Sequence, residues 1–406
     1  MHIIFLTHYF PPEVNAPASR TYENCTRWAA KGHRITVITC VPNTPDGIIY
    51  KGYKNRLYQW EEMDMVRVLR VWTYITPNKG IIRRTLNFIT YMLFSLFVGL
   101  FVKNGDIIIA TSPQFFCAIG GYILSCFKQL PFIMEVRDLW PESIVAVEAF
   151  THRKFIKIFE NLEIWLYNKA KYIVVVTESF KRIIAKKGIS DEKIFVVKNG
   201  VDLDIYNPRV SGHATRKKLY MERKFVVSYI GTIGMAHALH HLLNVAQSLR
   251  HLHDIAFLLV GSGALRQFLT YEKEKRSLEN VFFLGRQPKE KTPLFYAASD
   301  VCLVPLKKDP LFKSVIPSKM FEIMAMAKPI ILSVDGEARE ILEAARAGIY
   351  VQPENENQLM NAILRLRKNK RDRITMGRNG NKYVKKHCNR DEMAHIYLNI
   401  ISQGVT

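Results

Sequence analysis

The amino-acid sequence predicts two doubly wound α/β domains in tandem. The chain has 406 residues, 48% of them hydrophobic, and short β-branched apolar runs alternate with amphipathic segments from end to end. A chain of this length exceeds one ordinary core, so two domains of about 200 residues are expected. Alternating strand and helix patterns are typical of parallel sheets covered by helices. The composition excludes disordered and collagen-like classes.

The first half of the sequence shows this alternation clearly. Strands are predicted at residues 2–8, 34–41, 65–72, 106–112, 131–138 and 171–177. Helices are predicted at residues 19–31, 82–103, 115–127, 152–168 and 179–187. Residues 41–62 are rich in Asn, Pro, Gly and Tyr, and we expect a long irregular loop there, of the kind that often carries function.

The second half repeats the pattern after a polar connector at residues 199–224. Strands are predicted at residues 225–231, 255–261, 280–285, 300–306, 329–334 and 348–353, and helices at 236–250, 265–275, 289–298, 318–326 and 338–345. We therefore predict an N-terminal Rossmann-like domain at 1–200, a second at 201–385, and a cleft between them. A C-terminal helix at 386–406 is expected to return to the first domain.

The chain is strongly basic, with a formal net charge of +22. This charge favours an anionic partner, such as nucleic acid, an anionic membrane or a phosphorylated substrate. The basic residues are dispersed and are not accompanied by a zinc-finger or RNA-binding signature, so we expect no nucleic-acid partner. The six cysteines form no C-x-x-C pair, which indicates free thiols in a reducing compartment.

Residues 85–102 form the most apolar segment, at the lower length limit for a transmembrane helix. Polar residues interrupt it, and its place between two predicted strands favours a crossover helix that partly faces lipid over a membrane span. The expected lipid-facing residues are Phe88, Tyr91, Met92, Phe94, Phe97 and Phe101, flanked by Arg83, Arg84 and Lys103. Because Pro11 and Pro12 end the first apolar run, we expect no signal peptide. The predicted location is cytoplasmic, peripheral on the inner membrane.

Two loops that follow predicted strands are candidate phosphate sites. HYFPPEVNAPASR joins the first strand to a helix, whose N-terminus suits a phosphate, although an ordinary connecting loop remains an alternative. VGSGALRQ places Gly261 and Gly263 directly after a strand, where they would let the backbone approach a ligand. Arg266 stands where a dinucleotide-binding loop has its third glycine, which favours a diphosphate over NAD.

The segment PLFKSVIPSKMFEIMAMAKPI is the most informative one. Pro317 suits the first turn of a helix, so backbone N–H groups near Ser318 and Lys319 could hold an anion. Lys319 adds a cation, and Glu322 lies about one turn further on, where it could bind a ribose diol. A surface helix with a solvated glutamate is the alternative.

The Asp202-Leu203-Asp204 run matches a pattern used by metal-dependent transferases of another fold. It lies in the interdomain turn, away from every candidate nucleotide loop, so we interpret it as structural. The sequence shows no other spacing typical of a metal site, and neither a metal nor a cofactor is expected.

Taken together, these segments resemble family four of the retaining glycosyltransferases, which have the GT-B fold. The resemblance is to the branch that builds bacterial O-antigens, capsules and colanic-acid-type polysaccharides. It is carried by YFPPEVNAPASR, EVRDLWPES, NGVDLDIYNP, YIGTIGMAHAL, VGSGALR, FLGRQP, SDVCLVPL and IPSKMFEIMAMAKPI. The segments cover nearly the whole chain in the family's order, and this ordered combination is specific.

The resemblance implies roles in the second domain. Glu322 corresponds to the second glutamate of the family's paired motif, which binds the donor ribose, while Ser314 replaces the first. The family's phosphate-binding Arg and Lys fall at Thr232 and His237. The implied nucleotide-sugar-binding residues of this domain are Thr232, His237, Gly261, Gly263, Arg266, Arg286, Ser318, Lys319 and Glu322.

The resemblance also implies roles in the first domain. Arg137 and Asp138 occupy the place of a His-Asp pair near the transferred sugar and are the expected catalytic residues. Asn15 and Ala16 stand where many relatives have two glycines and would face the donor phosphates across the cleft.

The implied reaction is transfer of a sugar, with retention, from a UDP-N-acetylhexosamine type of donor to a lipid-linked saccharide. Without a metal, helix N-termini and cations would stabilise the diphosphate leaving group. Two alternatives remain: a sugar-nucleotide epimerase of the same fold, and a non-enzymatic basic protein that binds membranes or nucleic acid. The epimerase would need an acid/base pair, for which residues 137–140 offer one carboxylate.

Overall fold

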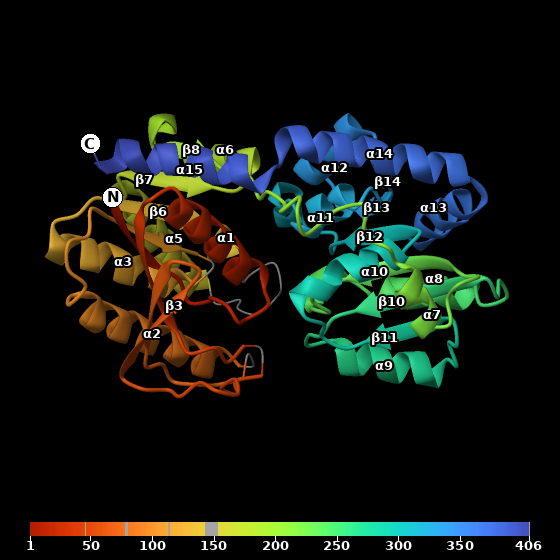
Figure 1. The fold of residues 1–406 in the computed structure, drawn as a ribbon, viewed down its shortest axis with the longest axis horizontal. Helices are drawn as coiled ribbons and strands as arrows, with labels where there is room; N and C mark the ends of the chain where they lie inside the picture. The colour runs from red at the N-terminus through yellow and green to blue at the C-terminus, as the bar shows by residue number, and fades with distance from the viewer. Residues whose placement is uncertain (45, 78–79, 113, 143–152, 406) are drawn as a thin grey trace. The chain divides into compact units, whose positions relative to one another are not determined.

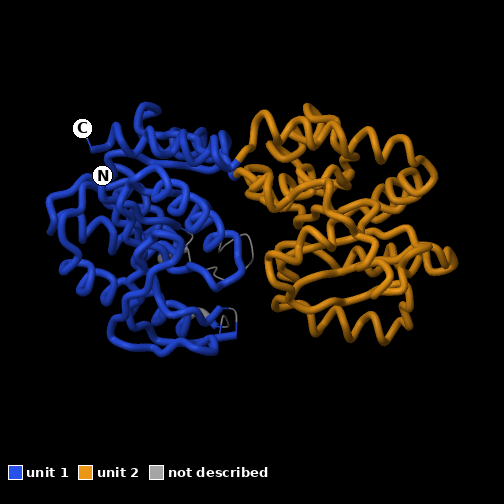
Figure 2. Tube along the Cα trace, viewed as in Figure 1, with its two compact units in different colours: residues 1–199, 390–406 blue, residues 200–389 orange. Residues whose placement is uncertain are grey.

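The chain forms two compact units, which Figure 2 draws in different colours. The computed structural model describes residues 1–44, 46–77, 80–112, 114–142 and 153–405. Unit 1 comprises residues 1–199 and 390–406, and unit 2 comprises residues 200–389. Each unit is built on its own largely parallel sheet, as the predicted fold class requires.

Within the described residues, the sheet of unit 1 has eight strands in the order β3-β4-β2-β1-β5-β6-β7-β8. They are β1 (His2–Leu6), β2 (Arg34–Cys40), β3 (Tyr58–Met63), β4 (Val66–Val71), β5 (Ile107–Thr111), β6 (Phe132–Val136), β7 (Tyr172–Val175) and β8 (Ile194–Val196). Strand β1 pairs in parallel with β2 and β5, placing Ile3 opposite Ile35 and Ile107. Its residues are all buried, which explains a continuous apolar run instead of alternation.

The helices of unit 1 are α1 (Ala16–Ala30), α2 (Ile81–Gly99), α3 (Phe115–Lys128), α5 (Arg153–Lys169), α6 (Glu178–Lys186) and α15 (Arg390–Val405), with the 3-10 turn η1 (Asp191–Lys193). Helix α15 packs on α1, as predicted for the C-terminal helix (Figure 1). The indole Nε1 of Trp28 donates to the carbonyl oxygen of Ala394 at 2.9 Å, and its ring meets Tyr397 edge-on at 5.1 Å.

The prediction of an irregular loop at residues 41–62 is wrong for its last residues, because strand β3 begins at Tyr58. Strand β3 is antiparallel to β4 and lies at the sheet edge, with Trp60 opposite Leu69. Its side chains alternate between exposed and half-buried, so it lacks the apolar run that marks the central strands. Strand β8 and helix α7 (His213–Lys218) were not predicted either, because elements this short give little periodicity.

The sheet of unit 2 has six strands among the described residues, in the order β11-β10-β9-β12-β13-β14, all paired in parallel. They are β9 (Phe225–Ile230), β10 (Ile255–Val260), β11 (Val281–Leu284), β12 (Val301–Pro305), β13 (Ile330–Ser333) and β14 (Gly348–Tyr350). Besides α7, the helices are α8 (His240–Ser248), α9 (Arg266–Lys275), α10 (Thr292–Ala298), α11 (Lys319–Ala325), α12 (Glu337–Ala345), α13 (Glu356–Lys368) and α14 (Lys370–His387), with 3-10 turns η2 (Met235–His237), η3 (Lys289–Lys291) and η4 (Pro310–Ser314).

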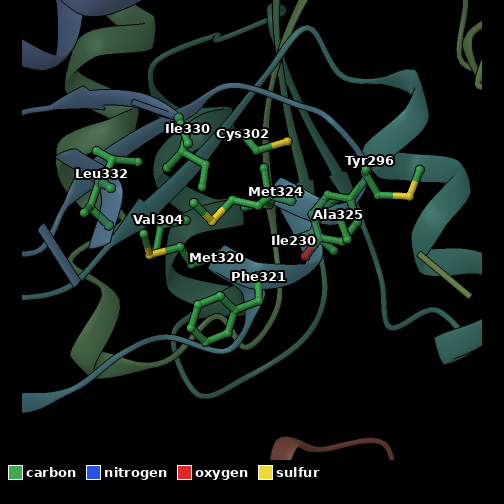
Figure 3. Close-up of a cluster of buried hydrophobic side chains, with 14 of the residues drawn as sticks. Ile230, Tyr296, Cys302, Val304, Met320, Phe321, Met324, Ala325, Ile330 and Leu332 are labelled. Carbon is green, nitrogen blue, oxygen red and sulfur yellow. The ribbon is translucent and has the colours of Figure 1, made fainter. Parts of the chain in front are cut away.

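Helix α11 is fixed by apolar side chains. It buries Met320, Phe321 and Met324 in the cluster that contains Ile330 and Leu332 of β13 (Figure 3). Because these three residues anchor one face, the positions of Lys319 and Glu322 on the same short helix are set by the core.

Helix α2 exposes only part of the face that the sequence predicted. Tyr91 is fully buried and donates a hydrogen bond to the carbonyl oxygen of Ile38, and Phe88 packs edge-on against His8. Phe94 contacts Trp72, and Phe88, Met92 and Phe94 are half-buried. Phe97 and Phe101 are exposed as predicted, and the other exposed apolar residues are Ile82, Leu86, Leu93 and Leu100. Over the part of the chain described, no helix combines the length and apolarity needed to cross a bilayer.

Candidate functional site

Two loops at the carboxyl ends of β9 and β10 are joined by backbone hydrogen bonds. The N–H of Ile233 donates to the carbonyl oxygen of Ser262 at 2.9 Å, and the N–H of Leu265 donates to that of Ile233 at 3.0 Å. A Cβ atom on Gly261 would lie 1.9 Å from the carbonyl oxygen of Gly231, and one on Gly263 would lie 2.5 Å from that of Ile233. The structure thus gives these glycines a specific task, which is to let the two loops approach each other.

The ammonium group of Lys319 lies beside the first of these loops. Its Nζ is 3.9 Å from the centroid of the Tyr229 ring and 2.6 Å from the point that a Cβ atom on Gly231 would occupy. This Nζ is buried and has no hydrogen-bond partner among the described residues. Burial lowers the pKa of Lys319 to about 7, against the opposing effect of Glu322.

His237 lies in η2, not at the start of an α-helix as predicted. Its ring meets the Tyr229 ring edge-on at 5.7 Å, and its Nδ1 is buried without a partner in the described parts of the chain. Burial, together with the charge of Lys319, lowers the pKa of His237 to about 3. The imidazole is therefore neutral at physiological pH.

Glu322 is half-buried and is held by a neighbouring helix. The hydroxyl of Tyr296, on α10, donates to its Oε2 at 2.9 Å. Burial raises the pKa of Tyr296, so the hydroxyl keeps its proton. Ser314, which replaces the family's first glutamate, is buried, and its hydroxyl donates to the carbonyl oxygen of Leu311 at 2.6 Å. That hydroxyl stabilises its own 3-10 turn.

The remaining predicted donor residues of unit 2 are Ser318, Thr232, Arg266 and Arg286. Ser318 immediately precedes α11, and its side chain makes no capping hydrogen bond. Thr232 is exposed, and its carbonyl oxygen accepts from the Tyr229 hydroxyl. Arg266 begins α9. Its Nη2 atom lies 3.5 Å from the point that a Cβ atom on Gly285 would occupy. Arg286, the residue after Gly285, is exposed. Arg266 and Arg286 therefore lie near the end of β11.

The predicted catalytic residues follow β6 in unit 1. Arg137 donates through Nη1 to the carbonyl oxygen of Pro17 at 3.1 Å and through Nη2 to that of Ala16 at 3.0 Å. Burial lowers the pKa of Arg137 to about 10. Burial also raises the pKa of Asp138 to about 6, although Arg137 acts in the opposite direction. Asp138 can therefore exchange a proton near neutral pH, while Arg137 positions the loop that precedes α1.

That loop contains the other predicted residues of unit 1. The Oδ1 of Asn15 accepts from the N–H of Ala18 at 2.8 Å and caps helix α1. Ala16 contributes the carbonyl oxygen that Arg137 binds. The structure thus brings Asn15, Ala16, Arg137 and Asp138 together in unit 1, whereas the remaining predicted donor residues lie in unit 2.

Sequence reasoning missed a buried ion pair next to the predicted catalytic residues. Arg20 donates through Nε to Oε1 of Glu135 at 2.9 Å, and both side chains are almost completely buried. Arg20 also donates to the carbonyl oxygens of Val197 and Lys198. The available signal was the glutamate in the otherwise apolar strand FIMEV.

The Asp202-Leu203-Asp204 run was expected to be structural. The Oδ1 of Asp202 accepts from the N–H groups of Asp204 and Ile205 within one turn, which is a structural role.

Comparison with known proteins gives matches along nearly the whole chain. The family model "Glycosyltransferase Family 4" matches residues 18–205, and "Glycosyl transferases group 1" matches residues 213–383. The chain is 23% identical over 375 residues to Escherichia coli WcaI, which is named as a colanic acid biosynthesis glycosyl transferase; the match covers 89% of this chain and 91% of that protein.

Solved structures share the fold at low sequence identity. Sucrose-phosphate synthase of Thermosynechococcus elongatus superposes with a TM-score of 0.80 and 18% identity, over 99% of this chain and 98% of that one. HepE of Anabaena, solved with UDP and glucose, superposes with a TM-score of 0.76 and 18% identity. The match covers 98% of this chain and 99% of that one.

Proposed function

Because this chain belongs to the glycosyltransferases of group 1 and family 4, we propose that it transfers an N-acetylhexosamine type of sugar from a UDP donor to a lipid-linked saccharide. The observation that carries this proposal is the grouping of Lys319, His237 and Glu322 at the carboxyl ends of β9 and β12 in unit 2. Ligands of open α/β sheets bind at the carboxyl ends of the strands. HepE binds UDP and UDP-glucose, and the name of WcaI supports a role in polysaccharide synthesis.

The chemistry assigns different tasks to the two units. The bond from the sugar C1 to the phosphate oxygen breaks, and a bond from C1 to the acceptor oxygen forms on the same face, which retains the configuration. The acceptor hydroxyl proton passes to the leaving diphosphate. In unit 2, Lys319 and Arg266 supply positive charge to that leaving group, a task that preorganised donors perform well without a divalent metal. In unit 1, Asp138 hydrogen-bonds a sugar hydroxyl, and Arg137 positions the loop that precedes α1.

The acceptor would be reached at an anionic membrane surface on the cytoplasmic side of the inner membrane. Helix α2 exposes Ile82, Phe97 and Phe101, which are 84%, 54% and 69% accessible. Arg83 and Lys103 lie exposed at the two ends of this face. Each basic residue near an anionic leaflet contributes about 1 kcal/mol. We propose peripheral attachment through this exposed face of α2.

Nucleotide binding tests the central proposal. Titration calorimetry with UDP, GDP and dTDP should give the tightest binding for UDP, and transfer from UDP-N-acetylhexosamines to lipid extracts should follow. Tighter binding of GDP would contradict the UDP donor, and an absence of binding to all three nucleotides would contradict the proposed function.

A further inference from the structure

Lys319 lacks the partners that a buried ammonium requires. A lysine ammonium can donate three hydrogen bonds, yet the buried Nζ donates none within the described part of the chain. The contact that it does make, with the face of the Tyr229 ring at 3.9 Å, supplies only a partial negative charge. Burying a charge without a hydrogen-bonded counter-ion is unfavourable. The side chain is therefore arranged to receive an anion from outside the protein.

Nζ lies beside a glycine and near a second unpartnered nitrogen. Gly231 has no side chain, and a Cβ atom there would lie only 2.6 Å from Nζ. The Nδ1 atom of His237 is also buried and without a partner among described residues, and its ring contacts the same tyrosine. Lys319 and His237 come from separate elements, α11 and η2, so the tertiary fold has brought two unsatisfied nitrogen groups to the end of β9.

The titratable groups facing Lys319 leave its ammonium weakly stabilised. Burial raises the pKa of Tyr229, on β9, and lowers the pKa of His237, on η2, to about 3. Both side chains therefore stay neutral between pH 6 and 8.5. Glu322, on α11 itself, favours the charged form of Lys319 but is held by Tyr296 of α10. Burial outweighs Glu322 and lowers the pKa of Lys319 to about 7.

We propose that Lys319 is the cation that binds the donor diphosphate, and that it takes up a proton from solvent when the diphosphate binds. The ligand class, a diphosphate, rests on the proposed function. The new elements are Lys319 as the residue that binds it and the uptake of a proton on binding. Thr232 is uncharged and His237 is neutral, so the loop after β9 cannot itself supply the positive charge. At the end of β9 the positive charge therefore comes from Lys319 on α11, while Arg266 begins α9 near the end of β11.

Proton uptake follows from the change in surroundings. A diphosphate next to Nζ stabilises the charged form and so raises the pKa above its free value. With a free value of about 7, about half of the unliganded molecules carry this proton at pH 7 and about a tenth at pH 8. Binding should then take up about half a proton at pH 7 and about 0.9 at pH 8, and affinity should fall about fivefold over that interval. A terminal phosphate with a pKa near 6 is about nine-tenths ionised at pH 7 and almost fully ionised at pH 8.

The test is calorimetry of the full-length protein with the tightest binder among UDP, GDP and dTDP. Titrations at pH 7.0 and 8.0, in buffers of different ionisation enthalpy, give the number of protons taken up. In Lys319→Arg the guanidinium stays charged, so both proton uptake and the fivefold pH dependence should disappear while binding persists. Uptake that is absent in the wild type, or unchanged in Lys319→Arg, would overturn this inference without touching the proposed function.

A second variant separates ligand binding from a structural role. Lys319→Met replaces an unpaired buried charge with an apolar chain of similar length, so the unliganded protein should melt at the same or a higher temperature. Its nucleotide affinity at pH 7 should fall about tenfold or more. The matched control Lys275→Met, at an exposed position of α9, should change neither. A lower melting temperature with unchanged affinity would show that Lys319 is structural and would refute the proposal.

Discussion

Replacing Glu322 by alanine tests the assignment of the ribose-binding residue. The change removes a carboxylate that is oriented by Tyr296 at 2.9 Å and anchored through the buried Met320 and Phe321. A hydrogen bond to a charged group contributes about 1.5–3 kcal/mol, which corresponds to roughly tenfold to 150-fold in affinity. Calorimetry with UDP should therefore show a loss within this range.

The same substitution has a predictable effect on stability. The buried hydroxyl of Tyr296 loses its acceptor, which costs about 1–3 kcal/mol when no water replaces it. Tyr296→Phe is the matched control, because it removes the hydroxyl and leaves the Glu322 carboxylate in place. It should bind UDP with a smaller loss than Glu322→Ala. A folded Glu322→Ala protein with wild-type affinity would refute the assignment.

Three further predictions follow from other parts of the structure. Transfer activity should persist in EDTA, whereas a loss restored only by manganese or magnesium would contradict stabilisation of the leaving group by cations of the protein. Membrane attachment should weaken at 1 M salt, where the Debye length falls to about 3 Å. Phe97→Glu should abolish membrane attachment, whereas the control Tyr220→Glu, at an exposed position of unit 2, should leave it unchanged. Equal attachment of the two variants would show that the α2 face does not bind the membrane. Asp138→Asn should raise the melting temperature at pH 7, because ionising a carboxyl whose pKa is about 6 costs stability. The gain should shrink at pH 5, where the wild-type carboxyl is protonated, and a gain independent of pH would contradict a titrating Asp138.

The sequence alone determined the fold class and most of the elements. Buried parallel strands such as β1 and β10 are continuous apolar runs, and their helices carry a clear apolar period, so both are visible locally. The segment around Lys319 and Glu322 was also recognisable, because a proline, a cation and a carboxylate stand together at a strand–helix junction. The edge strand β3 was missed because its exposed side chains remove the apolar signal.

Only the tertiary structure decided what these residues contact. Gly261 and Gly263 permit two loops to pack, and Asn15 caps a helix, which local sequence cannot distinguish from ligand contacts. The unpaired state of Lys319 depends on Tyr229 and His237, which lie more than 80 residues earlier in the chain. A pKa is set by burial and by neighbouring charges in space. Residue type therefore identified Lys319 as a cation, and the placement of its side chain over Tyr229, next to His237, decided that it is a cation without a partner among the described residues.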